Sequence, residues 1–136
     1  MTTGAGPRIV VVGSYVHVFT IQVPRAPLDG ETVIASTSRA DPGGKGSNQA
    51  VQMARLGAEV ELLAVVGDDP AGATALELWR QEGVGARLVR TDPGLPTGLA
   101  FVILEASGKN RIAVDVGANA ALGAPDVARA GAAIEA

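Results

Sequence analysis

The residues whose types and spacing best suit ligand binding are Gly43-Gly44-Lys45-Gly46-Ser47-Asn48, which stand directly before a predicted helix. Adjacent glycines let a backbone pass close to a ligand, and a helix N-terminus presents N–H groups to it. Lys45 adds three donors, and Asn48 adds both donors and an acceptor. This set suits a polyhydroxylated ligand, because each hydroxyl donates and accepts. Alternatively, the glycines make only a turn and a helix cap.

The common nucleotide-binding motifs do not match this segment. Gly46 follows Lys45 where a Walker A loop has Ser or Thr, and no glycine stands five residues before Gly44. Gly13-Ser14-Tyr15-Val16 does not continue into the dinucleotide fingerprint. A Rossmann-like nucleotide-binding domain is therefore a disfavoured alternative.

The elements that must position this loop alternate between strands and helices. The β-branched run Ile9–Val12 predicts a central strand buried on both faces of a parallel sheet. Further strands are predicted at residues 15–23, 32–38, 60–66, 86–89, 99–105 and 110–116. Helices are predicted between Gly44 and a stop at Gly57, from Asp69-Pro70 to a stop at Gly83, and over the tail at residues 125–136.

This order predicts an α/β fold: an incomplete parallel sheet with flanking helices and right-handed crossovers. Residues 15–39 and 98–116 are expected to form two inserted hairpins that make a small separate β-sheet. Their turns are predicted at Asp29-Gly30 and Ser107-Gly108. The 136 residues are expected to be one domain, with 47% hydrophobic residues to build a core.

Composition disfavours several classes of protein. A net charge of -3 gives no basic surface for nucleic acid, and the absence of cysteine excludes disulfides and thiolate metal sites. His17 is the only histidine, so no metal site is expected. Met1–Arg8 is small and polar, and the apolar run after it is too short for a signal or a membrane span. A cytoplasmic protein without a membrane partner is predicted.

The glycine-rich segment resembles the first signature of the PfkB family of carbohydrate kinases, the ribokinase-like kinases. The matching positions are Gly43-Gly44, Gly46, Asn48, Ala50, Gly57 and Gly67. Further similar stretches cover nearly the whole chain: Asp29-Gly30-Glu31-Thr32, Gly67-Asp68-Asp69-Pro70, Thr97-Gly98 and Gly117-Ala118-Asn119-Ala120-Ala121-Leu122.

The resemblance implies that a β lid built from the two hairpins covers a sugar or nucleoside. It implies that Gly44, Lys45 and Asn48 contact hydroxyls, while Gly43, Gly46 and Ser47 shape the loop. A homodimer through the lid strands is also expected.

Catalysis in this family uses a later Gly-Ala-Gly-Asp segment, with magnesium-bound ATP as phosphoryl donor. Nothing resembling that segment occurs in the 136 residues. No catalytic residue is therefore assigned, the ATP and Mg²⁺ sites are expected mostly outside the chain, and the chain alone is expected to be inactive.

One departure concerns substrate recognition. Where ribokinases have Asn and Asp on one face of the first lid strand, this sequence has Val16 and Val18. Alternation places His17 on the opposite face unless the strand bulges. Ribose is therefore in doubt: either the substrate is less hydroxylated, or the sequence has drifted from kinase function.

Two hypotheses follow. The first is the sugar-binding part of an ATP-dependent carbohydrate kinase, which transfers phosphate to a hydroxymethyl group. The second is a non-enzymatic truncated homologue that binds a polyol or associates through its lid. Asp69 is expected to cap a helix and Trp79 to lie in the core, while Asp115 faces either the sugar or solvent.

Overall fold

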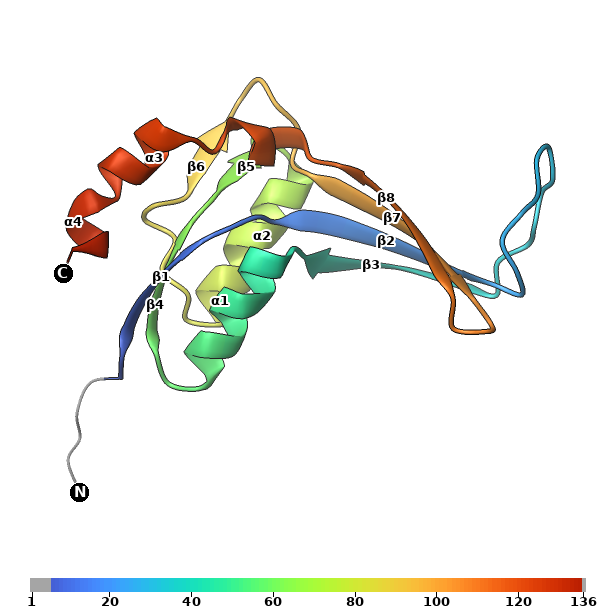
Figure 1. Cartoon of the computed structure of the whole chain (residues 1–136), viewed down its shortest axis with the longest axis horizontal. Coiled ribbons are helices and arrows are strands. Elements are labelled where there is room, and N and C mark those ends of the chain that lie inside the picture. Colours follow the sequence, from blue (N-terminus) through green and yellow to red (C-terminus); the bar gives the residue numbers. More distant parts are fainter. Residues whose placement is uncertain (1–5, 136) are drawn as a thin grey trace.

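The computed structural model describes residues 6–135. Residues 1–5, within the polar start Met1–Arg8, and Ala136, the end of the predicted tail helix, lie outside the described residues. An α/β part carries the helices, and a lid of four strands extends away from it (Figure 1).

The α/β part is built on short parallel strand pairs, as predicted. β1 (Arg8–Val12) pairs with β4 (Glu59–Leu63), and β5 (Val65–Gly67) pairs with β6 (Arg90–Asp92). Helices α1 (Lys45–Arg55) and α2 (Pro70–Gln81) lie side by side (Figure 1) and end two residues before their predicted stops. The tail forms two short helices, α3 (Ala124–Arg129) and α4 (Gly131–Ile134).

The core lies between this sheet and the two longer helices. Val11 and Leu62 point from β1 and β4 toward Ala50 of α1 and Trp79 of α2, and all four are buried. Burial of these apolar side chains is the main favourable contribution to folding. Trp79 is fully buried, which confirms the core position predicted for it.

The lid is a four-stranded sheet in the order β3-β2-β7-β8. Its strands are β2 (Val16–Val23), β3 (Thr37–Gly43), β7 (Leu99–Glu105) and β8 (Asn110–Asp115), followed by the short 3-10 helix η1 (Gly117–Ala121). β2 with β3 and β7 with β8 pair antiparallel, and β2 pairs parallel with β7. The two predicted hairpins thus lie side by side and form one separate sheet.

The second strand of the first hairpin was predicted too early. It lies at Thr37–Gly43 rather than at residues 32–38, so the first lid segment reaches Gly43 instead of residue 39. Asp41-Pro42-Gly43 resembles a turn in sequence, but β3 is an edge strand, where proline is tolerated because one side of the strand needs no N–H donor. Pairing of Val16 with Gly43 sets the register.

Three further strand predictions need correction. The strand predicted at residues 60–66 is interrupted at Ala64, and the one predicted at 86–89 lies at Arg90–Asp92, after an isolated bridge between Gly85 and Glu61. β1 is not buried on both faces: Val11 is buried, but Val12 is 52% exposed. The helices α1 and α2 cover only the face that carries Val11.

Asp69 caps α2 and also anchors the second lid hairpin. Its Oδ1 accepts from Gly72 N at 2.8 Å and from Thr97 Oγ1 at 2.7 Å, while Oδ2 accepts from Thr97 N at 2.7 Å. Thr97 Oγ1 accepts in turn from Gly67 N at 2.9 Å. The capping role predicted for Asp69 is confirmed, and the same carboxylate joins β5, α2 and the start of the lid.

These contacts make the free energy of unfolding depend on pH under acidic conditions. Burial acts to raise the pKa of Asp69, but the hydrogen bonds from Thr97 and Gly72 outweigh it and hold the pKa below the ordinary 3.8. The unfolded chain therefore binds the proton more readily. The stabilisation is present above the ordinary pKa and is lost as pH falls through the lower, folded-state value.

We expect Asp69→Asn to lower the free energy of unfolding at pH 7 by about 1–2 kcal/mol, because a charged cap and its hydrogen bonds are lost. The loss should shrink as pH falls below 3.8, because the unfolded wild-type chain then takes up the proton at Asp69 before the folded chain does. Urea unfolding followed by Trp79 fluorescence measures the loss at each pH. Asp29→Asn, at an exposed position, is the matched control; equal effects of the two variants would contradict the assignment.

Candidate functional site

The glycine-rich loop lies where the lid meets the first helix. Gly43 ends β3, Gly44 is the N-cap residue of α1 with φ 98°, and Lys45 begins the helix. A positive φ of this size strongly favours glycine. The sequence prediction of a helix start at this motif is therefore confirmed in position, and Gly44 makes the change of direction from strand to helix.

Two glycines bring the start of α1 against the end of β1. A Cβ atom on Gly46 would lie 2.5 Å from Gly13 Cα and 2.6 Å from Ser14 N. Ser47 N donates to Ser14 O at 3.1 Å across the same contact. Any side chain at position 46 would push the helix away from the turn between β1 and β2.

The six loop residues differ in burial, and Gly44 is half-buried. Gly43, Gly46 and Ser47 are buried, whereas Lys45 and Asn48 are exposed. Ser47 Oγ accepts from the indole N–H of Trp79 at 2.8 Å, so its side chain points into the core. Lys45 and Asn48 are the loop side chains that are available to a ligand.

Val16 and Val18 lie against this loop. A Cβ atom on Gly43 would be 2.5 Å from Val18 Cγ2 and 3.8 Å from Val16 Cγ2. The register agrees, since Val16 pairs with Gly43 and Val18 with Asp41. The two valines thus form a methyl-lined wall beside the glycine-rich loop.

The same lid face continues as an apolar surface across β7 and β8. Val18 pairs with Ala100, which pairs with Val114, and Ile112 pairs with Val102 one step farther along the strands. Ile112 and Val114 are 57% and 54% exposed. This face, which we call the valine face after Val16 and Val18, presents mainly C–H groups along β2, β7 and β8.

The opposite lid face carries His17 and the aromatic residues. Phe19 and Phe101 stack with ring centroids 5.6 Å apart, and His17 packs edge-on against Phe19 at 5.2 Å. The phenol of Tyr15 lies 3.3 Å from His17 Nδ1. We call this the aromatic face; His17 lies on it, as alternation along the strand predicts.

Asp115 also lies on the aromatic face, because it pairs with Leu99, two residues before Phe101. Its Oδ1 accepts from Gly117 N at 3.0 Å, which fixes the turn after β8. Asp115 therefore points away from the valine face.

Asn119 fixes the base of the lid, a role that the sequence did not reveal. Its Oδ1 accepts from Tyr15 N at 3.0 Å, and its Nδ2 donates to Tyr15 O at 2.7 Å and to Val116 O at 2.8 Å. The side-chain amide thus makes the two hydrogen bonds to the Tyr15 backbone that a neighbouring strand would otherwise make at the entry to β2. The Gly-Ala-Asn spacing was visible in sequence, but its partner stands 104 positions away.

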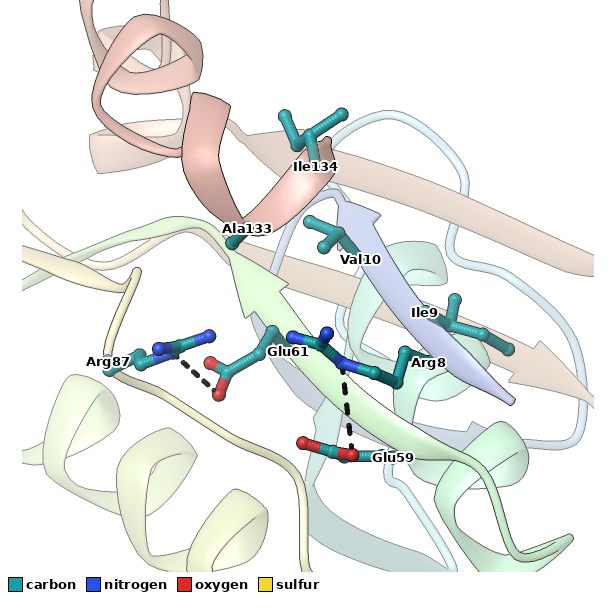
Figure 2. A pocket seen from close by; sticks show the side chains of 8 residues that line it. All are labelled: Arg8, Ile9, Val10, Glu59, Glu61, Arg87, Ala133 and Ile134. Atoms are coloured by element: carbon teal, nitrogen blue, oxygen red, sulfur yellow. Dashed lines mark ion pairs between the residues drawn. The ribbon is translucent and has the colours of Figure 1, made fainter. Parts of the chain in front are cut away.

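A hollow of about 210 Å³ lies elsewhere, beside the first residues of β1 and β4 and the end of α4 (Figure 2). Figure 2 shows its charged side chains in pairs: Arg8 lies 3.9 Å from Glu59, and Arg87 lies 2.9 Å from Glu61. Ligands of parallel sheets usually bind at the opposite, carboxyl ends of the strands. The glycine-rich loop, which follows the end of β1 in space, is therefore the better candidate site.

Residues 6–135 contain neither a membrane-spanning helix nor a group of metal ligands. No helix in this range has the length and apolarity needed to cross a bilayer. No three His, Cys, Asp or Glu side chains in the same range are grouped as metal ligands.

A parallel sheet, a glycine-started helix and an inserted β lid together define a ribokinase-like sugar kinase fold. The chain belongs to the pfkB family carbohydrate kinases, whose pattern matches residues 7–135.

Similar proteins include the ribokinase of Bacillus subtilis, 39% identical over 112 residues, which cover 82% of this chain and 38% of that protein. The deoxyribokinase of Salmonella typhi is 33% identical over 122 residues, 90% of this chain and 40% of that protein. The ribokinase of Arabidopsis thaliana, solved with ribose and ATP, has a TM-score of 0.75 and 36% identity over 85% of this chain and 38% of its own. The chain thus spans about two fifths of the length of these relatives.

Unfolding measurements can distinguish Ser47, which anchors the loop to the core, from Asn48, whose side chain is exposed. Ser47→Ala should lower the free energy of unfolding by about 1–3 kcal/mol, because the buried Trp79 N–H loses its acceptor. Asn48→Ala should change it by less than about 0.5 kcal/mol, since the side chain is exposed. Urea unfolding monitored by circular dichroism compares the two; similar losses would contradict the division.

Proposed function

We propose that this chain provides the sugar-binding surface of an ATP-dependent carbohydrate kinase, one that phosphorylates a hydroxymethyl group of a pentose or nucleoside. Lys45 and Asn48, together with the backbone of Gly44, contact the hydroxyls, while Gly43 helps to shape the loop. The main support for this proposal is that the loop contacts the valine face of the lid at Gly43. Gly46 and Ser47 hold the loop in place.

The relatives support this proposal at two points. The Arabidopsis ribokinase was solved with ribose and ATP, so a protein with this fold holds a sugar and a nucleotide together. The deoxyribokinase of Salmonella typhi is named for a sugar with fewer hydroxyls. Val16 and Val18 offer no hydrogen bonds, which favours a substrate with a C–H surface toward the lid.

The described residues do not fit the nucleotide and its metal ion. The loop lacks the Walker A residues, and residues 6–135 offer no group of acidic side chains for Mg²⁺. In family members the catalytic Asp stands in a Gly-Ala-Gly-Asp segment, which the 136 residues do not contain. We therefore assign this chain substrate binding and shielding by the lid, and we expect no phosphoryl transfer by the chain alone.

The lid would exclude water from the reacting hydroxyl. Its four strands are anchored at their base by Asn119 on Tyr15 and by Asp69 on Thr97. Exclusion of water prevents loss of the phosphoryl group to hydrolysis and strengthens electrostatic interactions in the site. The apolar valine face suits this role.

Calorimetric titration with D-ribose, 2-deoxy-D-ribose and adenosine tests the proposal. We expect at least one of them to bind and Asn48→Ala to weaken that binding at least tenfold, because the loop loses a donor and an acceptor. Circular dichroism of both proteins serves as the folding control. A folded wild-type chain that binds none of the three would contradict the proposal.

A second function, association through the lid, is favoured by the exposed aromatic face. Phe101 and Phe19 are 50% and 40% exposed, and Ile21 beside them is 39% exposed. An apolar surface of this kind on a single sheet layer commonly marks an interface. The aromatic face lies opposite the loop, so a homodimer formed there would leave the sugar surface accessible.

We expect the chain to sediment as a dimer and Phe101→Ser to shift it to a monomer, because the centre of the apolar surface is lost. Sedimentation velocity over a range of concentrations measures the change. Leu56→Ser is the control: it replaces another exposed apolar residue, 78% exposed after α1 and away from the lid, and should leave the dimer intact. A monomeric wild-type chain would contradict this second function.

A further inference from the structure

The valine face leaves a sugar without the carboxylate acceptor that the family pattern supplies from β2. Another carboxylate lies on the neighbouring strand of the same surface. Asp41 of β3 pairs directly with Val18. Directly opposite residues in an antiparallel pair have Cβ atoms about 4.5–5.5 Å apart on the same face. Asp41 therefore projects beside Val18, two residues before Gly43.

Asp41 also lies near the exposed side chain of the loop. Asp41 and Asn48 line the same shallow hollow of about 380 Å³ at the edge of β3, which Pro42 of β3, further residues of α1 and Leu78 of α2 also line. A hydroxylated ligand that contacts Asn48 is thus within reach of position 41. Two separate observations, the strand register and this shared hollow, connect the carboxylate with the proposed sugar surface.

Arg39 holds the Asp41 carboxylate in place. Arg39 Nε donates to Asp41 Oδ2 at 2.6 Å, and both residues lie on the valine face because they are two apart on β3. Within residues 6–135, Asp41 Oδ1 has no hydrogen-bond partner. The pair therefore offers one charged acceptor and, on the guanidinium, further donors, which matches two neighbouring hydroxyls of a sugar.

A purely structural role explains this pair poorly. The side chains of Arg39 and Asp41 are 67% and 49% exposed. Exposed ion pairs of this kind contribute little to stability. Substitution at position 41 should thus leave the fold intact, so that a change in binding can be read directly.

We propose that Asp41, positioned by Arg39, accepts a substrate hydroxyl in place of the carboxylate missing from β2, and so determines which sugars bind. This inference rests on the proposed sugar-binding function. The acceptor for the hydroxyl then comes from position 41 of β3 instead of position 18 of β2. Val16 and Val18 then contact the C–H side of the same sugar.

The test is calorimetric titration of the 136-residue chain with D-ribose, 2-deoxy-D-ribose and adenosine. Asp41→Asn should weaken the ligand that binds the wild type by about tenfold, because a charged acceptor becomes a neutral one. Asp115→Asn, which removes the same charge from the aromatic face, should leave the affinity unchanged. The double variant Asp41→Ala, Val18→Asp should recover most of the affinity that Asp41→Ala loses.

The outcomes separate this inference from the function on which it rests. If Asn48→Ala abolishes binding while Asp41→Asn binds like the wild type, the role of Asp41 is overturned and the sugar site stands. Equal weakening by Asp41→Asn and Asp115→Asn would also overturn it, because the effect would then be one of net charge. If the folded wild type binds none of the three probes, the proposed function fails and the inference fails with it.

Discussion

The close contact between Gly13 and Gly46 is the constraint on which the site depends. It joins the end of the first parallel strand to the first turn of α1, and no side chain fits between them. Gly44 can then turn the chain from β3 into the helix with a positive φ. The lid, the helix start and the sheet consequently meet at one place, and Lys45 and Asn48 emerge there into solvent.

Polar side chains then fix the lid relative to this junction. Asp69 ties the entry of the second hairpin to the start of α2, and Asn119 ties the exit of that hairpin to the entry of the first. Both act on backbone groups that no neighbouring strand satisfies at these turns. The lid is thus anchored at its base, while its two faces stay largely exposed.

The two faces of the lid divide the proposed functions. The valine face borders the glycine-rich loop and carries Asp41, whereas the aromatic face carries Phe19 and Phe101 on the opposite side. This arrangement permits sugar binding and association at once, because neither needs the residues of the other. Under the proposed role of Asp41, the departure of the sequence from the family pattern at positions 16 and 18 is a local change: β3 instead of β2 supplies the acceptor.

The sequence by itself determined the class of fold, the family, the helix start at Gly44, the cap at Asp69 and the alternation that separates His17 from Val16 and Val18. These depend on local backbone chemistry and on spacing, which a sequence displays directly. Only the tertiary structure decided the register of β3, the exposure of Val12, the face of Asp115 and the partners of Ser47 and Asn119. Strand register and side-chain pairing across 32 or 104 positions depend on how distant segments pack, and no local pattern encodes them.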